Sequence, residues 1–202
     1  MEIKYNQIME TTVSYSLESK DEYRCFYDTV EVYQEAVSFL ISVVSENYDS
    51  IESAGNQQYK QRAVEKLVHT TEGNEARYKA FDKRFHKFPS YFRRSAISTA
   101  LGAVESYRKN LMLWEQSDRK YKKPRLKVDR NAMPVFFKGN MFTLSKDGDE
   151  YDCSIKLRIR NDWIWKSFRF RKTDLAYLEK KGLRLEDAMS PVLKKNGKNN
   201  MK

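Results

Sequence analysis

Cysteine and histidine, the residues that build most metal centres and many nucleophilic sites, are scarce in this sequence. The cysteines, Cys25 and Cys153, lie far apart and form neither a CxxC pair nor a Cys/His cluster, which excludes a recognisable zinc site. We expect both to be buried thiols in a reducing compartment. The histidines, His69 and His86, have no Ser, Cys or Asp at a spacing that suggests a triad, so we expect surface or structural roles.

Long hydrophobic runs are missing as well. The longest apolar stretch, Ala36 to Val44, contains serines and is far too short to cross a bilayer. The first residues, Met1 to Tyr5, have no apolar core of a signal peptide. We therefore expect a cytoplasmic protein without membrane contact.

No set of residues makes a convincing catalytic centre. There is no glycine-rich phosphate loop, and no carboxylates from separate elements converge as a two-metal nuclease requires. The acidic cluster Asp147, Asp149, Glu150 and Asp152 does not have the spacing of an EF-hand, so a solvated turn is the better interpretation. We predict no metal, no cofactor and no enzymatic activity.

Charge is abundant and unevenly distributed. The 202 residues carry a net charge of +10, and 13% of them are aromatic. Residues 1–56 hold three basic and eleven acidic side chains, whereas residues 57–202 hold 35 basic and 17 acidic ones. So basic a segment favours a polyanionic partner, most commonly nucleic acid. A basic protein without a specific partner is the alternative, which the aromatic residues among the cations disfavour.

Helical periodicity dominates the first 120 residues. Ser19 and Glu22 match a capping box, and the apolar stripe that follows predicts a helix to about Asn47. The stripe consists of Tyr23, Phe26, Val30, Tyr33, Val37, Leu40 and Val44. We predict a polar loop after this helix, over residues 47–56. Further helices are expected over about 57–69, 75–85 and 91–117, the last capped by Ser90.

Strand-type patterns follow the basic connector 120–130. Short runs at 134–138 and 141–145 flank Gly139-Asn140, a hairpin-type pair. Residues 151–159 alternate as a strand with one buried face, and a turn at Asn161-Asp162 leads into a second strand over 163–171.

A short helix is then expected from Thr173 to before Gly182. We therefore predict an α+β fold, with a helical bundle over 18–120 and a small, mainly antiparallel β-barrel-like domain over 121–202.

Two stretches interleave basic and aromatic residues, as nucleic-acid-binding surfaces do. In the first, residues 78–94, the phenylalanines at 81, 85, 88 and 92 have core spacing, which leaves the cations and one tyrosine as contact candidates. These are Lys79, Lys83, Lys87, Tyr91, Arg93 and Arg94. A helix junction with a solvated basic face is the alternative.

The second stretch follows the two predicted strands. Lys156, Arg158 and Arg160 should face away from the buried side of the first strand and could track a phosphate backbone. Further cations on the second strand are Lys166, Arg169 and Arg171. Exposed cations that prevent unwanted strand pairing are an equally good explanation.

Residues 190–195 resemble one more strand, and Asn196-Gly197 is a strong hairpin turn. None of the five residues after it is an apolar residue placed to pair and pack. An ordinary polar tail and a chain cut short inside a hairpin are both compatible with this pattern.

Several local strings, in this order, resemble the N-terminal part of the transposon-encoded TnpB (OrfB-type) proteins, which are related to compact type V CRISPR effectors. They are YRCFYDTV at 23–30, FPSYFRRSAI at 88–97 leading to Tyr107 and Trp114, KPRL at 123–126, and SPVLKKNG at 190–197. The resemblance covers nearly the whole chain, but only about the first half of a full family member.

This resemblance implies a recognition lobe for the helical part and a wedge domain for the β-part, to which residues 1–17 would add a strand. It implies guide RNA and target-flanking DNA as partners. The segment 91–99 resembles the helix that meets the flanking DNA, which suggests Arg93, Arg94, Ser95, Ser98 and Thr99 as contacts. The family's RuvC carboxylates and CxxC zinc ribbon match nothing here, so the resemblance implies a truncated or nuclease-less form that cannot cut DNA alone.

Three other hypotheses remain open at this point. The chain could be a metal-dependent nuclease acting alone, a scaffold that docks a partner through the acidic helix 19–47, or the product of a decayed gene.

Overall fold

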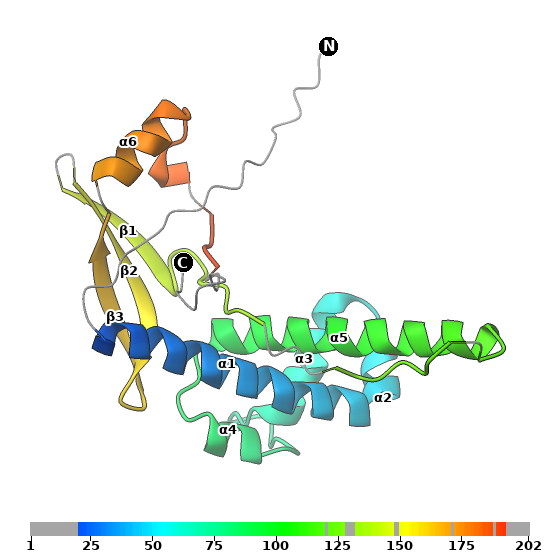
Figure 1. Cartoon of the computed structure of the whole chain (residues 1–202). Coiled ribbons are helices and arrows are strands. Elements are labelled where there is room, and N and C mark those ends of the chain that lie inside the picture. Colours follow the sequence, from blue (N-terminus) through cyan, green and yellow to red (C-terminus); the bar gives the residue numbers. More distant parts are fainter. Residues whose placement is uncertain are drawn as a thin grey trace, which may run out of the picture.

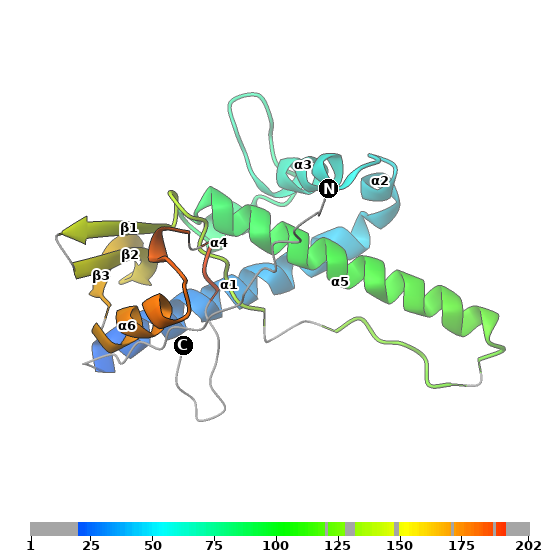
Figure 2. The ribbon, with the colours of Figure 1, turned by 90° about the horizontal axis from the view of Figure 1, so that it is seen from above.

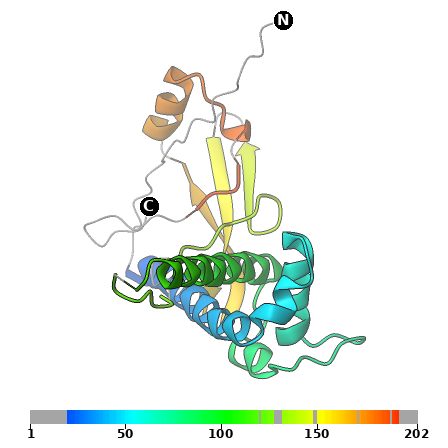
Figure 3. The same cartoon turned by 90° about the vertical axis from the view of Figure 1, so that its right-hand side faces the viewer.

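Two long helices and a small upright sheet make up most of the molecule (Figure 1). The computed structural model describes residues 20–119, 121–127, 132–147, 150–170, 172–187 and 189–192. Helices α1 (Lys20–Glu46) and α5 (Ser90–Gln116) lie side by side. In the view along α5, the sheet rises from the helical layer and α6 (Lys172–Lys180) lies toward its far end (Figure 3). The predicted strand in residues 1–17 falls outside the described residues.

Three shorter helices lie between α1 and α5 in the chain. They are α2 (Tyr48–Glu52), α3 (Gln57–Val68) and α4 (Ala80–Arg84). The helices predicted near 57–69 and 91–117 are confirmed. The polar loop predicted over 47–56 is wrong in part, because α2 forms there and buries Ile51. The helix predicted over 75–85 is wrong in its first half, since only its last turn is helical.

The described strands form an open antiparallel sheet in the order β1-β2-β3. Their bounds are Phe142–Asp147, Glu150–Ile159 and Asp162–Arg169. The predicted α+β class is confirmed, but the predicted barrel-like closure is wrong, because three strands are too few to curl into a closed barrel. Residues 134–138 form no strand of this sheet. They make isolated bridges instead, including Val135 to Val192.

One continuous hydrophobic core joins the helices to the sheet. The apolar stripe predicted on α1 is buried wherever its side chains are described, from Phe26 to Val44. On α5, Phe92 contacts Tyr33 of α1 edge to face, with ring centroids 5.8 Å apart. On the sheet, Phe168 packs against Phe26, with centroids 5.5 Å apart. The helical and β-parts predicted from the sequence therefore share their interior.

A second contact fastens the β2–β3 hairpin to the α4–α5 junction. The four phenylalanines of that junction are buried, as their spacing predicted, and form a chain of ring contacts. Trp163, at the start of β3, closes this chain, with its ring centroid 5.8 Å from Phe88 and 5.5 Å from Phe92. Aromatic pairs at these separations contribute about 0.5–1.5 kcal/mol each beyond the area they bury.

Thr29, a fully buried residue of α1, supplies a polar joint between α1 and β2. Strand β1 pairs with β2 only as far as Ile155, so the next backbone groups of β2 need other partners. The Arg158 backbone N–H donates to the Thr29 hydroxyl at 2.8 Å, and that hydroxyl donates to the Cys25 carbonyl at 2.7 Å. A single side chain on a helix thus continues the hydrogen bonding of the sheet.

We expect Thr29→Val to lower the free energy of unfolding by about 2 kcal/mol, because it leaves the Arg158 N–H buried without an acceptor. Thr29→Ser keeps the hydroxyl and loses one methyl group, at a cost of about 1 kcal/mol. Urea denaturation followed by circular dichroism measures both. A loss in Thr29→Val that is no larger than in Thr29→Ser would show that the hydroxyl makes no net contribution.

Candidate nucleic-acid interface

The two basic stretches of the sequence meet at the turn between β2 and β3. Lys87, just after α4, places its Nζ 3.3 Å from a carboxylate oxygen of Asp162, the first residue of β3. The Trp163 backbone N–H and, after it, Lys87 hold the pKa of Asp162 below its ordinary value. Residues 75 positions apart in the chain therefore belong to one surface.

The turn itself differs from the prediction. Its two central residues are Arg160 and Asn161, with φ angles of 49° and 66°, and Ile159 pairs with Asp162. Positive φ at both positions is the geometry of a tight hairpin turn. Arg160 was predicted to lie on the strand beside Arg158, and this is wrong: its exposed side chain leaves from the tip of the hairpin. Left-handed backbone at a non-glycine residue costs roughly 1–2 kcal/mol.

The hairpin pairs two cations with two tryptophans across its strands. Lys156 is opposite Trp165, and Arg158 is opposite Trp163, so all four side chains share one face of the sheet. The Lys156 Nζ lies 6.0 Å from the centre of the Trp165 ring, and the Arg158 guanidinium carbon 5.9 Å from that of Trp163. We call this set, with Arg160 and Lys87 at the turn, the hairpin face.

The two tryptophans of the hairpin face have different surroundings. Trp163 is 9% exposed because it packs on the phenylalanine cluster, whereas Trp165 is 42% exposed. Within the described residues, Trp163 Nε1 and Arg158 Nη1 are buried donors without a hydrogen-bond partner, although Arg158 Nη2 reaches the Asn161 side chain at 3.1 Å. The sequence reasoning missed Trp165, whose position opposite Lys156 follows only once the two-residue turn is known.

The remaining predicted cations of the sheet are divided between its two faces. Arg169 is on the same face as Lys156 but pairs with Asp152 at 3.2 Å. Lys166 is on the opposite face, with its Nζ 5.8 Å from the ring centre of Phe168. Arg171 lies outside the described residues. Of the strand cations, Lys156 and Arg158 alone accompany the exposed tryptophan.

The predicted contacts on α4 and on the chain before it are exposed. Lys79 forms an ion pair with Glu75, one turn earlier. Within the described part of the chain, Lys83 makes no ion pair and points to solvent. Lys83 lies three residues after the start of α4. Its exposed charge extends the positive surface that continues at Lys87.

The start of α5 separates two neighbouring arginines. Arg93 is 7% exposed, and its Nε and Nη2 donate to one carboxylate oxygen of Glu65 at 3.1 and 3.0 Å. Arg94 is exposed and lies over the ring of Tyr91, 5.6 Å from its centre. Tyr91 in turn packs against Phe137. Arg94 is thus accessible to a ligand, whereas Arg93 ties α5 to α3.

The hydroxyl residues that the TnpB resemblance suggests as DNA contacts are engaged within the protein. Ser95 shares a hydrogen bond of 2.8 Å with the Tyr33 hydroxyl. Ser98 accepts from Gln61 and donates to the Arg94 carbonyl, and Thr99 donates to the Ser95 carbonyl. These side chains face α1 and α3 or their own helix.

The described residues hold no group of three or more His, Cys, Asp or Glu side chains able to bind a metal ion. His69 lies just beyond α3 and contacts the Asp82 carboxylate at 3.0 Å, while His86 is exposed. Burial raises the pKa of Cys153 to about 11. Cys25 is only half-buried, so the prediction that both thiols are buried is wrong for it.

No helix in the described ranges is both long and apolar enough to cross a membrane.

Arg93 and Arg94 give a direct test of the conclusion that the first is tied to α3 and the second is on the surface. We expect Arg93→Met to lower the free energy of unfolding by about 2 kcal/mol, because the Glu65 carboxylate then loses the charged hydrogen bonds that it accepts from Arg93. Arg94→Met should change it by less than about 0.5 kcal/mol, since its side chain is on the surface. Chemical denaturation of both variants measures the difference, and equal losses would contradict the assignment.

The comparisons with known proteins identify a family. No curated protein and no solved structure matches the chain. The profile of the Aq_aa04 family matches residues 11–161, a range that extends from before α1 through β2 to the hairpin turn. The matched range includes Lys87, Arg94 and Arg160, which are cations of the surface described above. The chain belongs to the Aq_aa04 family.

Proposed function

We propose that this protein binds nucleic acid through the hairpin face, with unpaired bases stacking on Trp165. The observation that carries the proposal is the pairing of an indole that is 42% exposed with Lys156 on the hairpin face. A bare indole offers a flat surface to any base, and a neighbouring ammonium group offers a partner to the phosphate beside that base.

The cations around the turn extend this surface. Arg160 projects from the hairpin tip, and Lys87 and Lys83 follow on the neighbouring chain. Asp162 offsets one of these charges and also holds Lys87 in place.

Single-stranded RNA is the ligand that this arrangement favours. Stacking on Trp165 requires bases that are not already stacked in a duplex, and sequence-tolerant recognition of this kind is typical of single strands. The TnpB resemblance implies guide RNA, together with target-flanking DNA near Tyr91 and Arg94, as the specific partners, and we include both in the proposal. The apolar stripe of α1 is already covered by the protein's own core, which leaves less support for a partner-docking role of that helix.

Fluorescence anisotropy with a labelled 20-nucleotide RNA, at several salt concentrations, tests the proposal. We expect Trp165→Ala to weaken binding about tenfold, within the usual range of about 1–3 kcal/mol for a stacked base. Tyr177→Ala is the matched control, because Tyr177 is an equally exposed aromatic on α6 with Lys181 5.8 Å from its ring centre.

Reversal of charge at the turn gives a second readout. Arg160→Glu and Lys87→Glu should each weaken binding several-fold at low salt and reduce the salt slope by about one. Lys180→Glu, at the end of the sheet opposite the turn (Figure 1), should leave both unchanged. Binding that is absent at low salt, or equally weakened in the control variants, would refute the hairpin face as the interface. Metal-dependent cleavage of the RNA or of DNA would favour a nuclease instead.

A further inference from the structure

The C-terminal half of α5 extends away from the rest of the protein. Val104 is its last buried residue, and from there to residue 127 no described side chain is fully buried. Figure 2 shows this half of α5 extending beyond the other helices, with the chain turning back alongside it. We call residues 108–127 the arm. The sequence predicted the end of a helix and a basic connector here, and it suggested no contact residues in them.

The arm is strongly basic. It holds eight basic and two acidic residues, a net charge of +6 in twenty residues. Its reversal, at Asp118 and Arg119, has φ angles of 52° and 61°. Two left-handed residues in succession turn the chain sharply, so that the basic segment 121–125 lies back beside the last turns of α5.

The reversal gathers two cations around one indole. The guanidinium carbon of Arg119 lies 5.5 Å from the centre of the Trp114 ring, and the Nζ of Lys123 lies 5.6 Å from it. Trp114 Nε1 donates to the Tyr121 backbone carbonyl at 2.6 Å, which ties the returning chain to the helix. The Tyr121 side chain takes no part in that bond and is 76% exposed.

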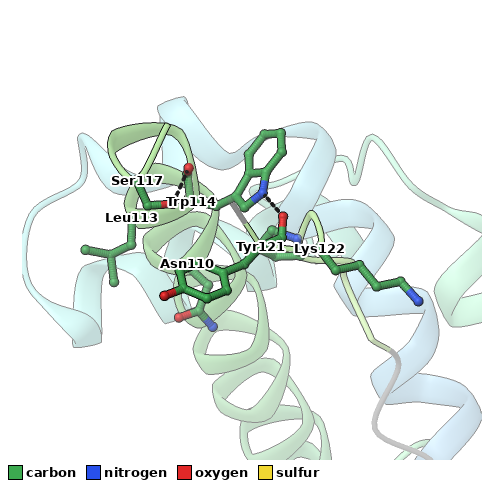
Figure 4. Close-up of a pocket in the computed structure, with 7 residues that line it drawn as sticks. Asn110, Leu113, Trp114, Ser117, Tyr121 and Lys122 are labelled. Carbon is green, nitrogen blue, oxygen red and sulfur yellow. Dashed lines mark hydrogen bonds between the residues drawn. The ribbon is translucent and has the colours of Figure 1, made fainter. Parts of the chain in front are cut away.

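A pocket of about 480 Å³ lies between the helix end and the returning chain. Figure 4 shows the Tyr121 ring reaching back toward Asn110 and Leu113, while Lys122 extends in the opposite direction. This hollow is open to solvent, and the Asn110 amide beside it supplies both a donor and an acceptor for the edge of a base. The lining thus combines aromatic surface, one amide and flanking positive charge.

We propose that the arm is a second, separate nucleic-acid site, in which an unpaired nucleotide of RNA stacks on Tyr121 and its phosphates contact Arg119 and Lys123. The proposal shares its ligand class with the proposed function but not its residues. An acidic protein segment would satisfy the cations, but it would leave the exposed ring and the amide-lined pocket without a matching group. Base-sized flat surface next to phosphate-binding charge is the combination that single strands require.

Ultraviolet cross-linking of the full-length chain to a 20-nucleotide oligouridine containing 4-thiouridine, followed by mass spectrometry, locates the contacts. We expect cross-links on the arm, at Trp114 or Tyr121, that decrease at least fivefold in Tyr121→Ala and persist in Trp165→Ala. Tyr59→Ala is the matched control, since Tyr59 on α3 is 52% exposed beside Arg62 and lies outside the arm.

The double variant Arg119→Glu/Lys123→Glu tests the charges separately. It should weaken binding of the same oligonucleotide about tenfold without changing the thermal unfolding midpoint, because the arm lies outside the core. Wild-type affinity in this variant, with cross-links confined to the hairpin face, would overturn the arm site and leave the proposed function intact. Cross-links confined to the arm would instead support the arm and refute the hairpin face.

Discussion

The attachment of the β2–β3 hairpin to the helices is the contact on which the rest of this structure depends. A small antiparallel sheet needs a covered hydrophobic face or a helix to pack against in order to be stable. Here Phe168 packs on α1, and Trp163 packs on the phenylalanines of the α4–α5 junction. Thr29 adds a hydrogen bond at the point where β2 runs beyond β1. Sheet and helices therefore fold around one interior, and their surfaces are held in a defined relation.

That attachment explains how two distant stretches of the chain present one organised surface. Lys87 and Asp162 come from distant stretches, and they meet because Trp163, next to Asp162, is anchored on Phe88, next to Lys87. This arrangement has an energetic cost. The backbone is left-handed at Lys87 and Arg160, and two buried donors beside the turn have no partner within the described residues. The arm differs, since it stands free of the core and depends on local contacts around Trp114.

The helical and strand repeats of the sequence predicted the structural features that depend on local sequence. The α1 stripe and the core spacing of the four phenylalanines followed from the helical repeat, and the alternation in β2 followed from the strand repeat. Tertiary contacts decided the rest. Arg93 and Arg94 are equally basic in the sequence, but only the first has Glu65 beside it. The position of Trp165 beside Lys156 depends on the register of a turn, and the arm depends on the direction of α5 beyond the core. Neither composition nor spacing contains this information.

The central claim is that the hairpin and the α4–α5 junction form one binding surface. Hydrogen–deuterium exchange of the full chain, with and without a 20-nucleotide RNA at low salt, tests it most directly. RNA should slow exchange in β2–β3 and in residues 83–94 together, and both protections should disappear at the same salt concentration. Protection of one segment without the other, or of neither, would contradict it.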